Sequence, residues 1–325
     1  MQNYKIKQTP EEFIVREIPT FKPIASGSYL IFLLKKKDYN TETAVQRVAD
    51  ALRIPRKNMG YAGSKDRQAV SEQFISIRGV PREKAESVNL KDISLKFVGF
   101  SKEKISLGEL EGNEFEIVVR NITNAPKQVS RIVNYFGEQR FSTNNAEIGK
   151  AIIKKDFKKA IETLLEHTGK EEDRIRSYLL AHKNDYVGAL KTIPWKNLTL
   201  YVHSYQSKIW NNAAKKIVEE RLAPAGNTTT LPIVGFATEL KDDNAGRIIR
   251  EIMEEEGVTQ QDFIIRAIPE LSVDGDERKL YTAINGLSIG ELEDDELNSG
   301  KKKVLLKFSL GKGSYATEAI KEMFH

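Results

Sequence analysis

The sequence predicts an α+β fold in which a helix-rich module interrupts a sheet-bearing domain. Strand-like segments occur in the first and last thirds of the chain, and helical periodicity dominates the middle. The 325 residues are enough for one large domain or two ordinary ones. With 40% hydrophobic and 30% charged residues, the composition is that of a soluble globular protein and not of a disordered one.

In the first third of the chain, the residue pattern predicts several strands and one helix. Residues 28–34 form an apolar run that is typical of a buried strand. Asn40 or Thr41 is expected to cap a helix that continues to about Arg53, because its apolar residues recur at helical spacing. Further strands are expected at residues 74–77, 93–98 and 114–120. Residues 127–135 are expected to be helical, with Gly137 ending that helix.

Helical patterns fill the middle of the chain, at residues 146–166, 171–181, 202–221 and 244–256. The last third returns to a strand at residues 302–310. A glycine-containing turn at residues 311–317 and a terminal helix complete the pattern.

Composition narrows the classes of function. The chain has no cysteine, which excludes disulfides, thiolate catalysis and cysteine zinc sites. Its four histidines do not pair at metal-ligand spacing. There is no apolar stretch of membrane-spanning length and no secretory leader pattern, so we expect a cytoplasmic protein without membrane contact. The formal net charge of +5 favours polyanionic partners mildly, as do the lysine runs at residues 35–37, 154–155, 158–159 and 301–303.

Residues 60–74, with the sequence GYAGSKDRQAVSEQF, form the most informative segment. Asp66 lies between Lys65 and Arg67, and nearby positive charge favours the ionised carboxylate. Small residues before this triplet would let a ligand approach the backbone closely. A surface turn with a solvated charge cluster is an equally good interpretation of this segment alone.

Three other segments carry groups that a reaction could use. Residues 7–17 alternate charged and apolar residues, and a plain edge strand explains them well. Residues 134–141 combine an amide, aromatic rings and an arginine, which suits stacking and hydrogen bonding of a nucleobase, although a helix end with core aromatics is the alternative. Residues 311–317 could present backbone amides to a phosphate, but they lack Walker spacing, and a simple glycine turn is at least as good an explanation.

Together these segments resemble the TruD family of pseudouridine synthases, of the archaeal type, over nearly the whole chain. Residues 63–73 match the family pattern G-x-K-D-x-x-A-x-T-x-Q, with Ser71 in place of threonine. Residues 134–141 match N-Y-F-G-x-Q-R-F, and residues 12–17 match the last six positions of E-D-F-x-V-x-E, with Glu12 at the aspartate position. Residues 206–211 resemble Q-S-x-x-F-N with Trp210 for phenylalanine, and the chain has the G-S-Y-A-T ending at residues 313–317.

The resemblance implies a fold, an activity and a set of site residues. It implies a pseudouridine-synthase catalytic domain at residues 1–155 and 292–325, with a mixed, largely antiparallel sheet and flanking helices. Residues 156–291 would form an inserted, helix-rich α+β TRUD domain. The implied activity is the isomerisation of uridine 13 of transfer RNA, with no cofactor and no metal.

The site residues follow from the same resemblance. Asp66 would be the nucleophile, attacking C1′ of the sugar or C6 of the base. Phe136 would stack on the target base, and Asn134 would hydrogen-bond near the base or orient Asp66. Lys7 would pair with the catalytic carboxylate, and Phe13 would shape the pocket. A non-catalytic RNA-binding protein of the same fold is the alternative, and the oligomeric state stays open.

Overall fold

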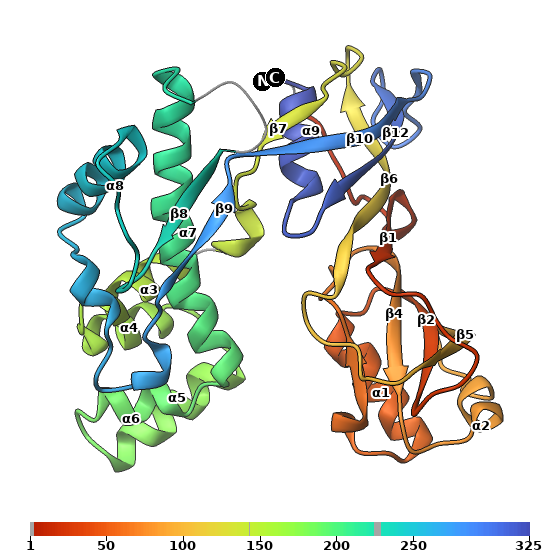
Figure 1. Ribbon diagram of the computed structural model, residues 1–325, viewed down its shortest axis with the longest axis horizontal. Coiled ribbons are helices and arrows are strands. Elements are labelled where there is room, and N and C mark those ends of the chain that lie inside the picture. Colours follow the sequence, from red (N-terminus) through yellow and green to blue (C-terminus); the bar gives the residue numbers. More distant parts are fainter. Residues whose placement is uncertain (1–2, 143, 224–228) are drawn as a thin grey trace. The chain divides into compact units, whose positions relative to one another are not determined.

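The chain folds into two compact units. The structure is a computed structural model that describes residues 3–142, 144–223 and 229–325. One unit comprises Met1–Ile132 and Ala283–His325, and the other is Val133–Thr282. Both contain helices and strands (Figure 1), which confirms the predicted α+β class. The predicted insertion, residues 156–291, shares most of its length with the second unit but begins and ends later in the sequence.

A mixed sheet forms the framework of the first unit. Its strand order is β5-β2-β4-β1-β6-β12-β10-β7, and the short strands β3 and β11 pair with β4 and β12. β1 and β4 are parallel, whereas β1–β6, β2–β4, β2–β5, β6–β12 and β10–β12 are antiparallel. The strands are β1 (Phe13–Pro19), β2 (Tyr29–Lys37), β3 (Met59–Tyr61), β4 (Val70–Ile77), β5 (Ile93–Ser101), β6 (Leu110–Ile122), β7 (Arg131–Val133), β10 (Tyr281–Ile289), β11 (Glu293–Asp294) and β12 (Lys302–Gly311).

The position of β1 corrects one sequence interpretation. Residues 7–17 could be explained as a plain edge strand, but β1 is hydrogen-bonded to β4 on one side and β6 on the other. β1 is therefore an interior strand, and the edge-strand explanation is wrong for it. The segment that carries Lys7 leads directly into this interior strand.

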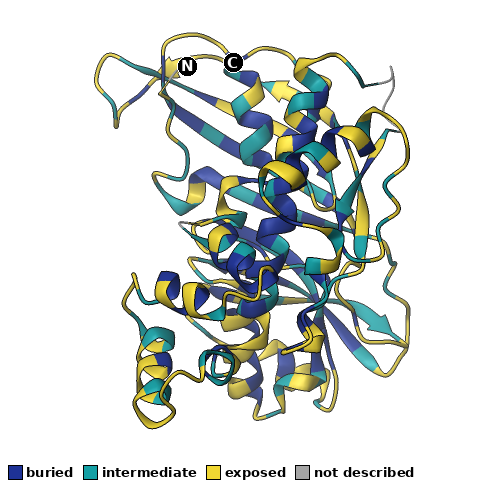
Figure 2. Ribbon diagram, turned by 90° about the vertical axis from the view of Figure 1, so that its left-hand side faces the viewer, coloured by how far each residue is buried: buried dark blue, intermediate teal, exposed yellow. Residues whose placement is uncertain are grey.

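Helices bury the apolar side chains of this sheet in two clusters. Helix α1 (Thr41–Leu52) begins at Asn40, whose side chain accepts the Thr43 N–H, and its buried residues pack with β2 and β4. Helix α9 (Ala316–Met323) packs on residues of β1, β6 and β12. The short helix α2 (Arg82–Glu86) contributes Ala85 to the α1 cluster. Buried positions follow the strands and one side of the helices, and the outer loops are exposed (Figure 2).

The second unit is mostly helical. Its longest helix, α7, packs against α3 where a side chain at Gly149 would come within 2.0 Å of the Tyr201 carbonyl oxygen, so only glycine fits. The helices are α3 (Asn145–Ile153), α4 (Phe157–Leu164), α5 (Lys170–Ala181), α6 (Tyr186–Lys191), α7 (Trp195–Glu219) and α8 (Asn244–Glu255). β8 (Thr230–Val234) and β9 (Gly275–Lys279) form an antiparallel pair.

Two helix predictions are wrong. Residues 127–135 are not helical: they contain strand β7, and Asn134 donates its backbone N–H to the Leu280 carbonyl across from it. Gly137 does not end a helix but precedes the short 3₁₀ turn Glu138–Arg140. Residues 146–166 form two helices instead of one, because the chain turns through a positive φ of 63° at Lys155 and Asp156 caps α4.

Candidate functional site

Asp66 lies in a loop between β3 and β4, residues 62–69, which we call the Asp66 loop. Buried side chains hold this loop from below. The Thr41 hydroxyl accepts the Lys65 N–H at 2.9 Å and donates to Gln73 Oε1 at 2.8 Å. Gln73 in turn donates to the Gly63 carbonyl at 2.9 Å. Side chains from the start of α1 and from β4 therefore fix the backbone that leads into Asp66, at Gly63 and Lys65.

The two cations beside Asp66 in sequence lie in different environments. Lys65 is 8% exposed, and its Nζ lies 2.6 Å from Glu17 Oε2. Glu17 also accepts the Phe74 N–H. Lys65 therefore balances a buried carboxylate within the fold and is covered by it, whereas Arg67 is exposed. Of these two cations, only Arg67 is accessible to a ligand.

The small residues before Asp66 serve the protein's own packing. A Cβ on Gly60 would lie 2.2 Å from the Ile105 carbonyl oxygen. Ala62 is buried in a cluster with Ile105 and Leu110. The close approach that the sequence suggested for a ligand is therefore made by the chain itself at these two positions.

The Asp66 carboxylate pairs with Lys7. The Lys7 Nζ lies 2.6 Å from Asp66 Oδ2, and the two side chains are 17% and 34% exposed. The ammonium also lies over the Phe13 ring, 4.2 Å from its centroid, in a cation–π contact. The structure thus brings together three of the five residues that the resemblance implied. The carboxylate keeps enough exposure for a substrate to reach it.

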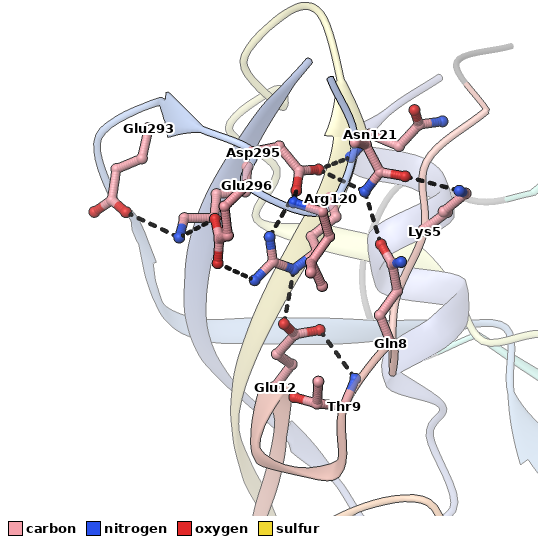
Figure 3. A network of polar contacts seen from close by, with 12 residues as sticks. Lys5, Gln8, Thr9, Glu12, Arg120, Asn121, Glu293, Asp295 and Glu296 are labelled. Atoms are coloured by element: carbon pink, nitrogen blue, oxygen red, sulfur yellow. Dashed lines mark hydrogen bonds and ion pairs between the residues drawn. The ribbon is translucent and has the colours of Figure 1, made fainter. Parts of the chain in front are cut away.

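A buried ionic cluster holds the segment that carries Lys7 (Figure 3). The Arg120 guanidinium binds Glu12 at 2.7 Å, Asp295 at 2.6 Å and Glu296 at 2.8 Å; we call these four residues the Arg120 cluster. Glu12 also accepts the Thr9 N–H. The backbones of Lys5 and Arg120 exchange hydrogen bonds of 2.9 and 2.8 Å. The chain is thereby fixed before and after Lys7, which itself has a φ of +57°.

The electrostatics of the Arg120 cluster favour the charged forms of Arg120, Asp295 and Glu296. The hydrogen bond that Arg120 donates to Glu296, together with those to Glu12 and Asp295, raises the pKa of Arg120. Burial raises the pKa of Asp295, but hydrogen bonds from Asn121 N–H, Asn298, Leu297 N–H and Arg120 outweigh it and lower the pKa to about 2. The bond to Arg120 is the main cause that lowers the pKa of Glu296. The acidic residues at positions 291–296 include two of the carboxylates that bind Arg120. The sequence does not reveal this pairing, because Arg120 lies 175 residues from Asp295.

Asn134 and Phe136 belong to the second unit. The Asn134 side chain accepts a hydrogen bond from Arg278 at 2.8 Å and donates to the Lys279 carbonyl at 3.2 Å. Arg278 also donates to the Asn134 carbonyl at 2.8 Å. Its guanidinium lies 4.1 Å from the centroid of the Phe136 ring. The amide of Asn134 therefore orients Arg278 over Phe136, an arrangement that sequence reasoning did not find.

Residues 206–211 secure Phe136 from α7. The Asn211 side chain accepts the Phe136 N–H and donates to the Phe136 carbonyl, both at 2.9 Å. The Trp210 ring packs edge-on against Phe136, with centroids 5.6 Å apart. Sequence reasoning singled out both motifs but did not predict that they contact each other.

A cavity of about 540 Å³ opens beside Phe136 within the second unit. Arg140, His203, Gln206 and Arg278 contribute to its wall. The Nε atom of Arg140 is buried, and no hydrogen bond to it occurs among the described residues. Burial and the Arg140 charge lower the pKa of His203, so that its imidazole is neutral at pH 7. The cavity thus offers a fixed cation and a neutral ring beside an aromatic side chain.

The other segments that the sequence singled out make contacts mainly within the protein itself. Residues 311–317 form the turn from β12 to α9, where Gly313 has a φ of +79° and the Lys312 N–H bonds to Glu111. Most lysines of the four runs pair with nearby carboxylates, such as Lys302 with Asp294. No group of three or more residues suited to hold a metal ion occurs in residues 3–142, 144–223 and 229–325. None of the described helices is both long and apolar enough to cross a membrane.

Comparisons with known proteins agree with one another. The model of the family "tRNA pseudouridine synthase D (TruD)" matches residues 2–178 and 218–323. A "Probable tRNA pseudouridine synthase D" of Methanopyrus kandleri is 31% identical, over 91% of this chain and 86% of its own. The "tRNA pseudouridine synthase D" of Aquifex aeolicus is 29% identical, with 98% of each chain covered. A crystal structure described as a TruD from Methanosarcina mazei has a TM-score of 0.76 at 28% identity, covering 99% of this chain and 94% of its own.

Proposed function

Because this chain belongs to the tRNA pseudouridine synthase D (TruD) family, we propose that it isomerises uridine 13 of transfer RNA to pseudouridine. Asp66 acts as the nucleophile in this proposal, and no cofactor takes part. The names of the relatives support the product and the class of RNA. The position in the RNA and the roles of individual residues come from the resemblance of the motifs around Asp66 and Phe136.

Among the features of the structure itself, the setting of Asp66 gives the proposal its main support. Asp66, on a loop fixed by buried hydrogen bonds, is partly exposed and pairs with Lys7 at 2.6 Å. A carboxylate that is held rigidly, ionised and accessible is what a nucleophilic step requires. A surface turn with a solvated charge cluster would not need Thr41 and Gln73 buried beneath it.

The chemistry matches these groups. In the isomerisation the bond from C1′ of the ribose to N1 of uracil breaks, a bond from C1′ to C5 forms, C5 loses its proton and N1 takes up a proton, so that atoms and charge balance. No electrons or groups pass to another molecule, so the net reaction needs no redox cofactor. Asp66 can assist by bonding covalently to C1′ or to C6, and both routes stay open. In either route the Lys7 ammonium steadies the carboxylate, and the Phe13 ring below it fixes the ammonium.

We assign the catalytic domain to the first unit and the TRUD domain to the second. In this proposal Asn134 and Phe136 bind the RNA from the second unit. The Phe136 ring, with the Arg278 guanidinium 4.1 Å from its centroid, offers π surfaces of the kind on which unstacked bases bind. Extruding a base costs a few kcal/mol, which such stacking and hydrogen bonds to the base edge offset.

The proposal is tested with two transfer RNA transcripts that carry tritium at C5 of uridine. One has uridine at position 13, and the other has cytidine there. We expect tritium release from the first transcript and none from the second. Release from both would contradict the choice of position 13. Binding of both transcripts without any release would instead support the non-catalytic RNA-binding alternative.

A further inference from the structure

The middle lysine of the run at residues 35–37 is buried. Lys35 and Lys37 lie on the surface side of β2 and pair with Glu72 and Glu11, whereas Lys36 has no exposed surface at all. Its side chain is on the same face of β2 as Phe32 and Leu34, below the Asp66 loop. A buried ammonium is costly unless polar groups replace the water that it loses. Lys36 therefore cannot bind RNA, and its position needs another explanation.

The partners of Lys36 are backbone carbonyls. Its Nζ donates to Tyr39 O at 2.5 Å and to Asp66 O at 2.9 Å, and lies 3.5 Å from Lys65 O. Within the described residues no carboxylate forms an ion pair with it. Each bond to a charged donor is stronger than one between neutral groups. One ammonium thus ties the turn after β2 to the backbone of Asp66.

We propose that Lys36 is a positioning residue for Asp66: through the Asp66 carbonyl it holds the carboxylate in register with Lys7 while making no contact with substrate itself. The proposal rests on the proposed function, since it concerns the same reaction. The Thr41 and Gln73 bonds hold Lys65 and Gly63, which both precede Asp66 in the loop. Lys36 is the group that bonds to the main chain of Asp66 itself.

The charge of Lys36 is sensitive to pH in an accessible range. Burial lowers the pKa of Lys36 to about 8; the negative charge of Asp66 opposes this shift, and the positive charge of Lys65 adds to it. Lys7 and Glu17 also lie at this loop, each already in an ion pair, and Arg67 on the loop itself is exposed. Above about pH 8 the ammonium becomes an amine with weaker hydrogen bonds. Arginine at this position would keep its charge throughout.

The experiment compares Lys36→Met, Lys36→Arg and the control Lys96→Met, an exposed lysine on β5. We expect Lys36→Met to lower kcat by about 100-fold, the typical cost of misplacing a catalytic group, with KM for transfer RNA unchanged. We expect kcat of the unmodified protein to fall above about pH 8, and Lys36→Arg should recover much of kcat without that fall. Lys96→Met should behave like the unmodified protein.

Several outcomes would overturn the positioning role. They are a kcat for Lys36→Met within about threefold of normal, an identical pH profile for Lys36→Arg and the unmodified protein, or failure of both variants to fold by circular dichroism. The last result would mean that Lys36 serves the fold and not the site. An unmodified protein that releases no tritium contradicts the proposed function instead, so the two failures are distinguishable.

Discussion

Lys7 and Asp66 are 59 residues apart in the sequence, yet Nζ of Lys7 lies 2.6 Å from Oδ2 of Asp66. Each is fixed by a separate buried network. The Arg120 cluster holds the chain on both sides of Lys7, and Thr41, Gln73 and Lys36 hold the Asp66 loop. The pair is therefore a product of the fold and not of a local turn.

Loss of Lys7 should impair catalysis more than binding. In Lys7→Met the carboxylate loses its partner and the charge that steadies it, and we expect kcat to fall by about tenfold to a hundredfold. Single-turnover tritium release under saturating enzyme measures this step directly. Lys22→Met, at an exposed lysine of the first unit, is the control. Equal rates for the two variants would show that the ion pair has no part in the reaction.

Arg67 should contact the phosphates of the RNA. It is exposed next to Asp66, and a lysine or arginine that neutralises one phosphate releases counterions. Arg67→Ala should weaken binding of transfer RNA and reduce the slope of log K against log salt by about one. Filter binding at several salt concentrations measures both. Gln68→Ala, at the exposed uncharged neighbour, should leave the slope unchanged; an unchanged slope in Arg67→Ala as well would remove Arg67 from the interface.

The Arg120 cluster should be a large contributor to the stability of the first unit. Arg120→Met leaves Glu12 and Asp295 buried without their cation, and removal of one partner from a buried ionic group typically costs about 3–5 kcal/mol. Lys303→Met breaks the exposed pair with Glu296 and should cost about 0–1 kcal/mol. Urea unfolding followed by circular dichroism measures both. Similar losses in the two variants would contradict the special position of Arg120.

The same cluster predicts how stability depends on acid. The pKa of Asp295 is lowered in the folded protein from 3.8 to about 2. A lowered pKa stabilises the folded state above the unfolded pKa, and this contribution is lost as the pH falls toward the folded value. The free energy of unfolding should therefore decline between about pH 4 and pH 2. The decline should be smaller in Asp295→Asn, measured by urea unfolding at each pH; equal declines would assign the acid sensitivity to other groups.

The sequence predicted the parts of the fold that depend on local patterns. Helix α1, strands β2 and β12 and the α+β class followed from periodicity and capping residues such as Asn40. The helix expected at residues 127–135 failed because apolar spacing there also fits a short strand, and its hydrogen-bond partners lie far away in β10. Long-range pairing overrides local propensity in such segments.

The sequence predicted candidate site residues but not the contacts that hold them. The motifs predicted Asp66, Lys7, Phe13, Asn134 and Phe136 as site residues, but not what surrounds them. The run at residues 35–37 gave no sign that Lys36 alone is buried, because charge patterns do not show which face of a strand meets the core. Arg278 was missed because it lies 144 residues from Asn134, and no local pattern connects them. Tertiary contacts between distant segments are what single-sequence reasoning lacks.

Asp66→Asn tests the central claim most directly. The change removes the nucleophile with almost no change in volume, and Asp38→Asn, at an exposed residue near the end of β2, is the isosteric control. The measurement is tritium release from C5-labelled transfer RNA, with binding measured in parallel. We predict that Asp66→Asn binds the RNA with nearly normal affinity and releases no tritium, while Asp38→Asn releases it at the normal rate. Full release by Asp66→Asn would contradict the account.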